Sequence, residues 1–144
     1  MFYLSFGRAV FGWTKGKGSG EDAGAKCKEI TFKNDLETKQ KLVKGYIECA
    51  YLQNDNDVVL IVNEEHKNLG MEWNRDIGYD IIGGPFLIVG DDYENGEFKS
   101  LTDAQILKYK IKFGKESIER TKRKLNAIKI EIALNRNRSY ESER

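Results

Sequence analysis

A short stretch in the middle of the chain carries the residues best suited to chemistry. His66 is the only histidine, and Glu64 and Glu65 directly precede it. A histidine beside carboxylates can exchange protons with a substrate, and Arg75 could hold an anion nearby, so these residues form a formal recipe for hydrolysis. The chain has no second histidine and no GxSxG nucleophile motif. We therefore interpret them as solvated loop charges or an intraloop network, and we predict that the protein is not an enzyme.

Two polar segments resemble ion-binding loops without fitting them. Residues 16–20 read GKGSG, but a phosphate-binding loop would end in Gly-Lys-Ser/Thr, whereas residues 25–27 read Ala-Lys-Cys. The turn at residues 54–57 lacks the central glycine and distal glutamate of a calcium loop. Cys27 and Cys49 have no CxxC spacing and are expected to be free thiols. We predict no metal site and no cofactor.

Alternating apolar residues and turn signals predict the elements that position these side chains. The pattern predicts a strand from residue 2 to residue 13, and helix N-termini at two capping boxes, Asn34 with Glu37 and Thr102 with Gln105. Further strands are expected at residues 26–32, 46–52, 58–62, 80–89 and near 98, and helices at residues 35–44, 103–113 and after 114. The predicted fold class is α+β, with a mainly antiparallel sheet of about five or six strands, one helix between strands 2 and 3, and two C-terminal helices.

Two segments between these elements are candidate sites. Residues 63–78 form a connection of about sixteen residues, which is long for a compact domain and typical of a functional loop. Gly83, Gly84 and Pro85 interrupt the strand at residues 80–89, which indicates a bulge or a close approach of the backbone to another group.

The segment after Gly114 is predicted to be a charged helix that frays from residue 135. Ile118, Leu125 and Ile132 lie seven residues apart with Ile128 between the last two, which is the spacing of a short coiled-coil seam. The helix either packs on its own domain or forms a homodimer or higher oligomer with further copies. Its basic surface consists of Arg120, Lys122, Arg123, Lys124 and Lys129.

Charge is distributed unevenly, although the net charge is only +1. Residues 53–103 contain twelve acidic and three basic residues, and residues 115–138 contain eight basic and three acidic ones. This asymmetry can guide association with a charged partner or between copies, or it can simply keep the protein soluble.

No apolar stretch approaches the roughly 20 residues that cross a bilayer. Because Arg8 interrupts the apolar start, we predict a strand there and a cytoplasmic protein.

Four motifs in the central part of the chain belong together. They are DLETKQKLVKGYIE (35–48), VNEEHKNLGMEWNRDI (62–77), DIIGGPFLIVG (80–90) and SLTDAQILKY (100–109). Residues 30–113 thereby resemble a domain family of unknown function found mainly in phages, plasmids and other mobile elements. The family's loop usually reads NEEGK, so His66 replaces a glycine here. Residues 1–29 and the helix after Gly114 are not part of the family pattern. We expect one α+β domain over residues 1–113, of which residues 30–113 match the family, followed by a charged helix and tail at residues 114–144.

Asn63, Glu64, Asn74 and Arg75 match the most characteristic polar positions of that family. Such a set is either a loop-closing network or a ligand site. Asparagine and arginine side chains are well suited to anchor a loop through backbone carbonyls, so the structural interpretation is favoured.

The resemblance also implies a biological setting, because accessory proteins of mobile elements often counter host immunity. The first hypothesis is a non-catalytic inhibitor that binds and blocks a host defence protein or nucleoprotein complex, such as a CRISPR effector. The alternative is an oligomeric sponge that sequesters a cyclic-nucleotide signal near Arg75, His66, Gly83 and Gly84, where glycines would let amides approach a phosphate. A small hydrolase or a DNA-binding regulator comes third. The basic helix argues only weakly for nucleic-acid binding, because residues 115–138 contain no aromatic residue on which a base could stack.

Overall fold

Every strand pair is antiparallel in the computed structural model, which describes residues 6–12 and 27–142. The elements in chain order are β1 (Phe6–Gly12), β2 (Cys27–Lys33), α1 (Leu36–Val43), β3 (Ile47–Leu52), β4 (Asp55–Asn63), β5 (Trp73–Asp76), β6 (Ile81–Gly83), β7 (Phe86–Asp92), β8 (Glu97–Lys99), α2 (Asp103–Lys112) and α3 (Lys115–Ser142). The alternating pattern expected at residues 2–5, the strand end at residue 13 and the Gly-rich loop at 15–24 lie outside the described residues.

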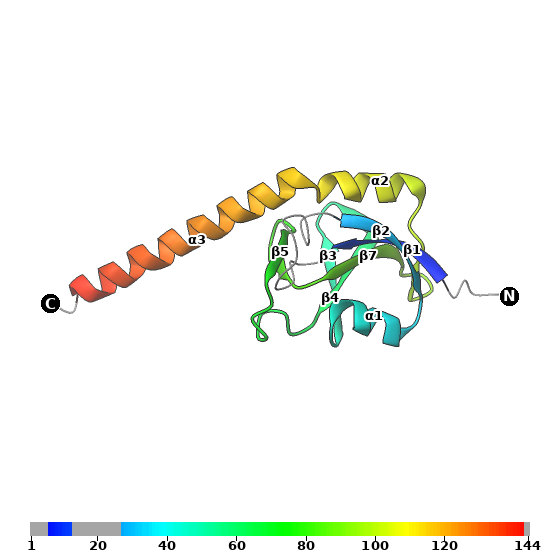
Figure 1. The fold of residues 1–144 in the computed structure, drawn as a ribbon, viewed down its shortest axis with the longest axis horizontal. Coiled ribbons are helices and arrows are strands. Elements are labelled where there is room, and N and C mark those ends of the chain that lie inside the picture. The colour runs from blue at the N-terminus through cyan, green and yellow to red at the C-terminus, as the bar shows by residue number, and fades with distance from the viewer. Residues whose placement is uncertain (1–5, 13–26, 143–144) are drawn as a thin grey trace, which may run out of the picture.

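The strands form one six-stranded sheet and one small two-stranded sheet. The order in the larger sheet is β2-β1-β7-β4-β3, and β8 pairs with the outer half of β7 beyond the residues that pair with β1. The smaller sheet contains β5 and β6. Figure 1 shows α1 on one side of the large sheet, α2 on the other, and α3 extending well beyond the domain.

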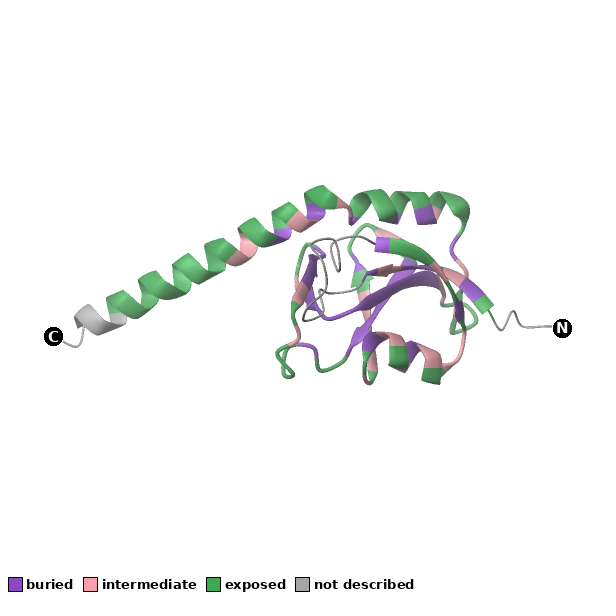
Figure 2. Ribbon diagram, viewed as in Figure 1, coloured by how far each residue is buried: buried purple, intermediate pink, exposed green. Residues whose placement is uncertain are grey.

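Side chains alternate between the two faces of the large sheet and build a core on each. One core contains Leu60, Ile88 and Phe86 from the sheet, together with Tyr109 and Phe113 at the C-terminal end of α2. The rings of Phe86 and Phe113 meet edge to face at 5.8 Å. The other core lies under α1 and includes Val59, Ile61, Leu87 and Val43. Figure 2 shows the purple strands enclosed between these layers, as the strand alternation requires.

The predicted fold class is confirmed: an antiparallel sheet of five to six strands, one helix between β2 and β3, and two C-terminal helices. The break at Gly84 and Pro85 is also present, and it separates β6 in the small sheet from β7 in the large one. The capping box of Thr102 and Gln105 begins α2 as predicted.

Three local predictions were wrong. The expected loop at residues 63–78 contains a strand, β5, because pairing with β6 and packing beneath α3 override its weak strand pattern. The β3–β4 turn lies at residues 53–54, so the polar run at 54–57 mostly belongs to β4. The tail expected to fray from residue 135 stays helical to Ser142, since neither glycine nor proline interrupts it.

The ends of α1 also differ from the prediction. Its N-cap is Asp35, whose side chain accepts from the Thr38 amide at 2.7 Å, and not Asn34, whose amide nitrogen instead donates to the Phe98 carbonyl. At the other end α1 stops at Val43, one residue before the predicted end, and Lys44 adopts the left-handed conformation with φ 64°. A Cβ on Gly45 would lie 2.7 Å from the Asn63 side chain, so Gly45 is needed for that close approach.

Candidate functional site

Asn63 is a buried link between the end of β4 and the end of α1. Its side-chain nitrogen donates to the carbonyls of Val43 at 3.1 Å and Lys44 at 3.2 Å, while its oxygen accepts from the Glu65 amide at 2.8 Å. The last carbonyls of a helix have no partner within the helix. Asn63 therefore caps α1 and starts the following loop, and no polar atom of its side chain is left for a ligand.

His66 faces the backbone of β6 and not the neighbouring glutamates. The side chain is buried, and its Nδ1 accepts from the Gly83 amide at 3.0 Å. A Cβ on Gly83 would lie 3.2 Å from that nitrogen, so the glycine permits the contact. Burial, followed by the charge of Lys67, lowers the pKa of His66, which keeps the ring neutral as the accepting Nδ1 requires. Glu64 and Glu65 are exposed.

This arrangement predicts a dependence of stability on pH that comes from His66. Its folded-state pKa lies below the unfolded value of about 6.5, so the unfolded chain binds the proton first. The free energy of unfolding should thus be at its plateau above that value and should fall as the pH drops below it. Carboxyls with lowered pKa, among them those of Asp55, Asp76 and Asp80, lose their contribution only below about pH 4.

Urea unfolding at a series of pH values between about 5 and 7.5 measures this dependence. We expect a clear slope in the wild type and a much smaller slope in His66→Gln, which cannot be protonated in that range. Equal slopes in the two proteins would show that another group titrates and would contradict the assignment.

Asn74 and Arg75 hold the centre of the domain together. The side-chain nitrogen of Asn74 donates to the carbonyls of Gly12 at 3.2 Å and Gly84 at 2.9 Å, which ties β1 to the β6–β7 break. Arg75 is 1% exposed. Its guanidinium donates to the Phe113 carbonyl at 3.1 Å, and to the backbone and side-chain oxygens of Asn74 at 3.0 and 2.9 Å. Burial lowers the pKa of Arg75, against the opposing effect of Cys27.

Of the predicted site residues, Asn63, His66, Asn74 and Arg75 thus use their side-chain hydrogen bonds inside the protein, whereas Glu64 and Glu65 face the solvent. The two glycine amides expected to approach a phosphate already donate, that of Gly83 to His66 and that of Gly84 to the Glu72 carbonyl at 2.7 Å. Among the described residues no group of three or more histidines, cysteines or carboxylates could hold a metal ion. The favoured role of this polar set is therefore to close the loop, and an anion there would have to displace existing bonds.

The basic helix surface is also partly used by the protein itself. Asp76, which is 7% exposed, accepts from Lys124 at 3.1 Å and lies 3.9 Å from the Arg120 guanidinium. The Asp76 amide donates to the Thr121 hydroxyl at 2.9 Å. Lys122 pairs with Glu119 within α3. Arg123 and Lys129 make no ion pair with any described residue and stay available to a partner.

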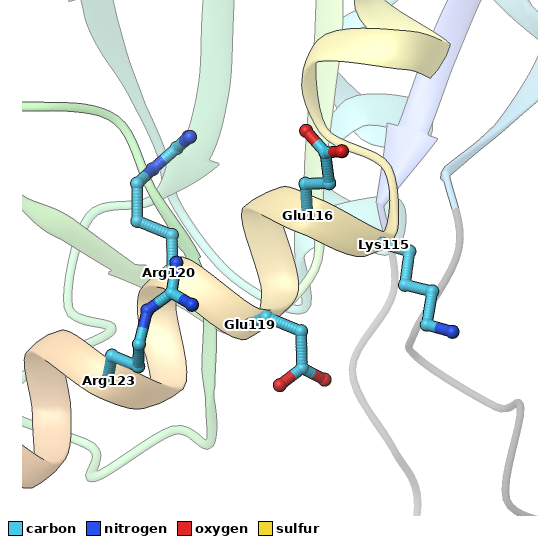
Figure 3. Close-up of a pocket in the computed structure, with 5 residues that line it drawn as sticks. All are labelled: Lys115, Glu116, Glu119, Arg120 and Arg123. Carbon is cyan, nitrogen blue, oxygen red and sulfur yellow. The ribbon is translucent and has the colours of Figure 1, made fainter.

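A hollow of about 430 Å³ lies beside the first turns of α3. Figure 3 shows the five charged residues that line it, which are Lys115, Glu116, Glu119, Arg120 and Arg123. Both signs of charge surround the space. The hollow therefore favours no particular ligand charge.

The sequence agrees with one known family model. Residues 21–114 match the domain of unknown function called DUF3846. The chain belongs to this family. The match begins nine residues before the resemblance seen in the motifs and ends at the junction of α2 and α3, so α3 lies outside the DUF3846 domain. No curated protein and no solved structure matches the chain.

The DUF3846 domain gathers acidic residues without ion-pair partners at one end of its large sheet. Register places Val58 opposite Gly90, so the preceding Asp57 neighbours Asp91, and Asp92 lies opposite Glu97 in β8. Among the described residues, Asp55 at this end pairs with Lys108 at 3.1 Å, whereas Asp57, Asp91, Asp92, Glu94 and Glu97 form no ion pair. We call this surface the acidic end and define it as Asp57, Asp91, Asp92, Glu94 and Glu97 with the tyrosines Tyr51 and Tyr93.

Two exposed tyrosines complete this surface, and neither was predicted as a site residue from the sequence. Tyr51 and Tyr93 are 54% and 62% exposed, and the Tyr93 hydroxyl donates to the Asn56 carbonyl at 3.0 Å. The charge of Cys49, then partial burial, and then the charges of Asp91 and Tyr93 raise the pKa of Tyr51. Their common location depends on strand register, and the acidic count along the sequence carries no such information.

In the described residues no helix is long and apolar enough to cross a membrane.

Proposed function

We propose that this protein is a non-catalytic accessory protein of a mobile element, such as a phage, and that it inhibits a host defence complex by binding to it. The observation that carries the proposal is the acidic end. None of its five carboxylates forms an ion pair with a described residue, although the adjacent Asp55 pairs with Lys108, and two exposed tyrosines lie among them. Aromatic residues are enriched at protein interfaces, and tyrosine is frequent among the residues that dominate binding energy.

The charge of this surface selects the class of partner. A row of carboxylates is complementary to a basic groove, and the grooves of nucleic-acid-binding complexes are basic because they bind phosphates. The acidic end would therefore occupy the nucleic-acid channel of a defence complex such as a CRISPR effector, in the host cytoplasm. Electrostatic attraction of this kind mainly accelerates association and weakens as salt increases.

The internal use of the loop residues supports a binding role over a catalytic one. His66 accepts from a backbone amide, and Arg75 is enclosed, so neither side chain is presented to a substrate. No comparable observation favours the nucleotide sponge, since the Gly83 and Gly84 amides are already engaged. A thermal-shift screen with cyclic nucleotides separates the two proposals, because a tightly bound signal must raise the melting temperature.

Charge reversal at the acidic end tests the inhibitor proposal. In cells that carry a CRISPR system directed against a phage, expression of the wild-type protein should restore plaque formation. The double variant Asp57→Lys/Asp91→Lys should lose this protection, because four units of charge change at the contact and like charges then face each other. Its melting temperature should stay close to that of the wild type, since neither side chain forms an ion pair with a described residue.

The matched control is Glu64→Lys/Glu65→Lys, which makes the same change of charge at two exposed residues outside the acidic end. This variant should protect as well as the wild type. Equal loss of protection in both variants would mean that only net charge matters. No protection by the wild type against any defence system would overturn the proposal.

A further inference from the structure

One edge of the large sheet is formed by β3, and part of its backbone points away from the sheet. β3 pairs with β4 and, among the described residues, with no other strand. The Glu64 amide donates to the Tyr46 carbonyl at 2.9 Å, so Tyr46 bonds toward β4, and the register stays regular up to Ala50. Residues of an antiparallel pair alternate between those that bond to the partner strand and those that do not. Ile47 and Cys49 therefore direct their amides and carbonyls outward.

These outward groups are open to a partner. Within the described structure no hydrogen bond reaches the backbone groups of Ile47 or Cys49 from outside the sheet. The next outward carbonyl, that of Tyr51, accepts from the Tyr79 hydroxyl at 2.8 Å. The side chains of Glu48 and Tyr51 are exposed. A donor thus already bonds to one end of this edge, and the rest of the edge is accessible.

β3 also lacks the residues that usually protect the edge of a sheet. Natural edge strands avoid further pairing through charged side chains, lysine above all, and through proline. The opposite edge of the sheet, β2, carries Lys28, Glu29 and Lys33 among its seven residues. β3 reads IECAYL, with Glu48 as its one charged residue and no lysine or proline. An edge of this composition is a template for the backbone of another extended segment.

The two faces of β3 specify the side chains of such a segment. Ile47 and Cys49 pack with the core under α1, whereas Ala50 packs with the core on the other face. Glu48 lies on the same face as Ala50, since side chains alternate along a strand. Glu48 is exposed and forms no ion pair with a described residue. A segment that alternates β-branched and basic residues therefore matches the apolar face and the carboxylate together.

We propose that β3 binds an extended basic segment of a partner protein as an added antiparallel strand. Antiparallel pairing continues the arrangement of every described strand pair. In this arrangement β-branched residues exchange backbone bonds with Ile47 and Cys49, and basic residues lie beside Glu48. The β3 strand of a second copy fits less well, because it would bring a second Glu48 to the same face, and like charges on paired strands are destabilising.

A synthetic peptide tests this binding mode without knowledge of the natural partner. The probe is KVKVKVK, blocked at both ends and labelled with a fluorophore, and anisotropy measures its binding to the full chain. We expect saturable binding, which is lost when glutamate replaces every lysine. Methylation of the valine amides should also abolish binding, because these amides point to β3, whereas methylation of the lysine amides, which point to solvent, should not. Absence of binding by KVKVKVK, or equal binding of the two methylated peptides, would overturn the proposal.

Proline at residue 49 tests the same contact from the side of the protein. Cys49→Pro removes an outward amide and no bond to β4, and proline is tolerated at such edge positions. It should weaken peptide binding by at least about tenfold, because a backbone bond is lost and the ring obstructs the approaching strand. The control Cys49→Val keeps the amide and should bind as the wild type does. Equal affinity of the proline and valine variants would contradict the assignment.

Two further measurements locate the peptide and identify the occupant. On peptide binding the amides of Ile47 and Cys49 should gain protection from hydrogen exchange, and Asp57→Lys/Asp91→Lys should still bind the peptide. This binding mode is independent of the proposed inhibition, and peptide binding that only the charge-reversed variant loses would place the peptide on the acidic end and overturn the proposal. A dimer of the chain alone that Cys49→Pro dissociates would show that a second copy occupies β3, which would also contradict it.

Discussion

Replacing Arg75 with leucine should destabilise the protein more than the loss of any other polar side chain in the buried network. The substitution removes the donors to the Phe113 carbonyl and to both oxygens of Asn74, all of them buried. A buried polar group left without a partner costs about 1–3 kcal/mol, so we expect the free energy of unfolding to fall by about 3 kcal/mol. For a domain of this size that corresponds to a decrease in melting temperature of about 10 °C.

The matched control is Arg8→Leu. Arg8 forms ion pairs with Glu29 and Asp103, but its side chain is 41% exposed, so water screens both pairs and their contribution to stability is small. Thermal or urea unfolding of both variants measures the difference. A loss from Arg75→Leu no larger than that from Arg8→Leu would mean that the guanidinium does not hold the α2–α3 junction, and would reopen Arg75 as a ligand-binding residue.

Replacing Asp76 with alanine should weaken the attachment of the first turns of α3 to the domain. Burial alone would raise the pKa of this carboxyl, but the Gly78 amide and Lys124 lower it overall, so it is charged at neutral pH. The variant loses the bonds to Gly78 at 2.9 Å and to Lys124 at 3.1 Å. We expect a decrease in the free energy of unfolding of about 2 kcal/mol.

Hydrogen exchange locates this effect. Amide protection should decrease at residues 115–124 and remain high in β4, because strand pairing does not involve Asp76 in that sheet. Glu37→Ala is the control, since it removes only an exposed pair with Lys41 that is worth about 0.5 kcal/mol. Uniform loss of protection across the domain would show that Asp76 stabilises the whole fold and not the attachment of α3.

The sequence predicts the parts of this fold that depend on local residues. Alternation gives the strands of the large sheet, and the capping box of Thr102 and Gln105 gives the start of α2. The break at Gly84 was predictable because Gly83, Gly84 and Pro85 are disfavoured inside a strand, and the observed φ of 74° at Gly84 is one that favours glycine. What could not be predicted is β5, whose four residues form a strand only because β6 and α3 lie against them.

The candidate site shows the same division. Residue types indicated that Asn63, Asn74 and Arg75 could anchor a loop, but their carbonyl partners come from α1, β1 and the end of α2, far away in the sequence. The acidic end was visible only as an excess of acids, because strand register decides which of them become neighbours. A charged helix after Gly114 was predicted from the residue pattern, whereas the packing of its first turns against β5 was not.

Target-DNA binding by a purified CRISPR effector, measured with and without the protein, tests the proposed function most directly. We expect the wild type to prevent target binding at stoichiometric amounts, and Asp57→Lys/Asp91→Lys to leave it intact, although both proteins melt at the same temperature. The decisive effectors are those against which the protein protects phages in cells. If each of them still binds its target DNA in excess wild-type protein, the claim that the acidic end occupies a nucleic-acid channel is contradicted.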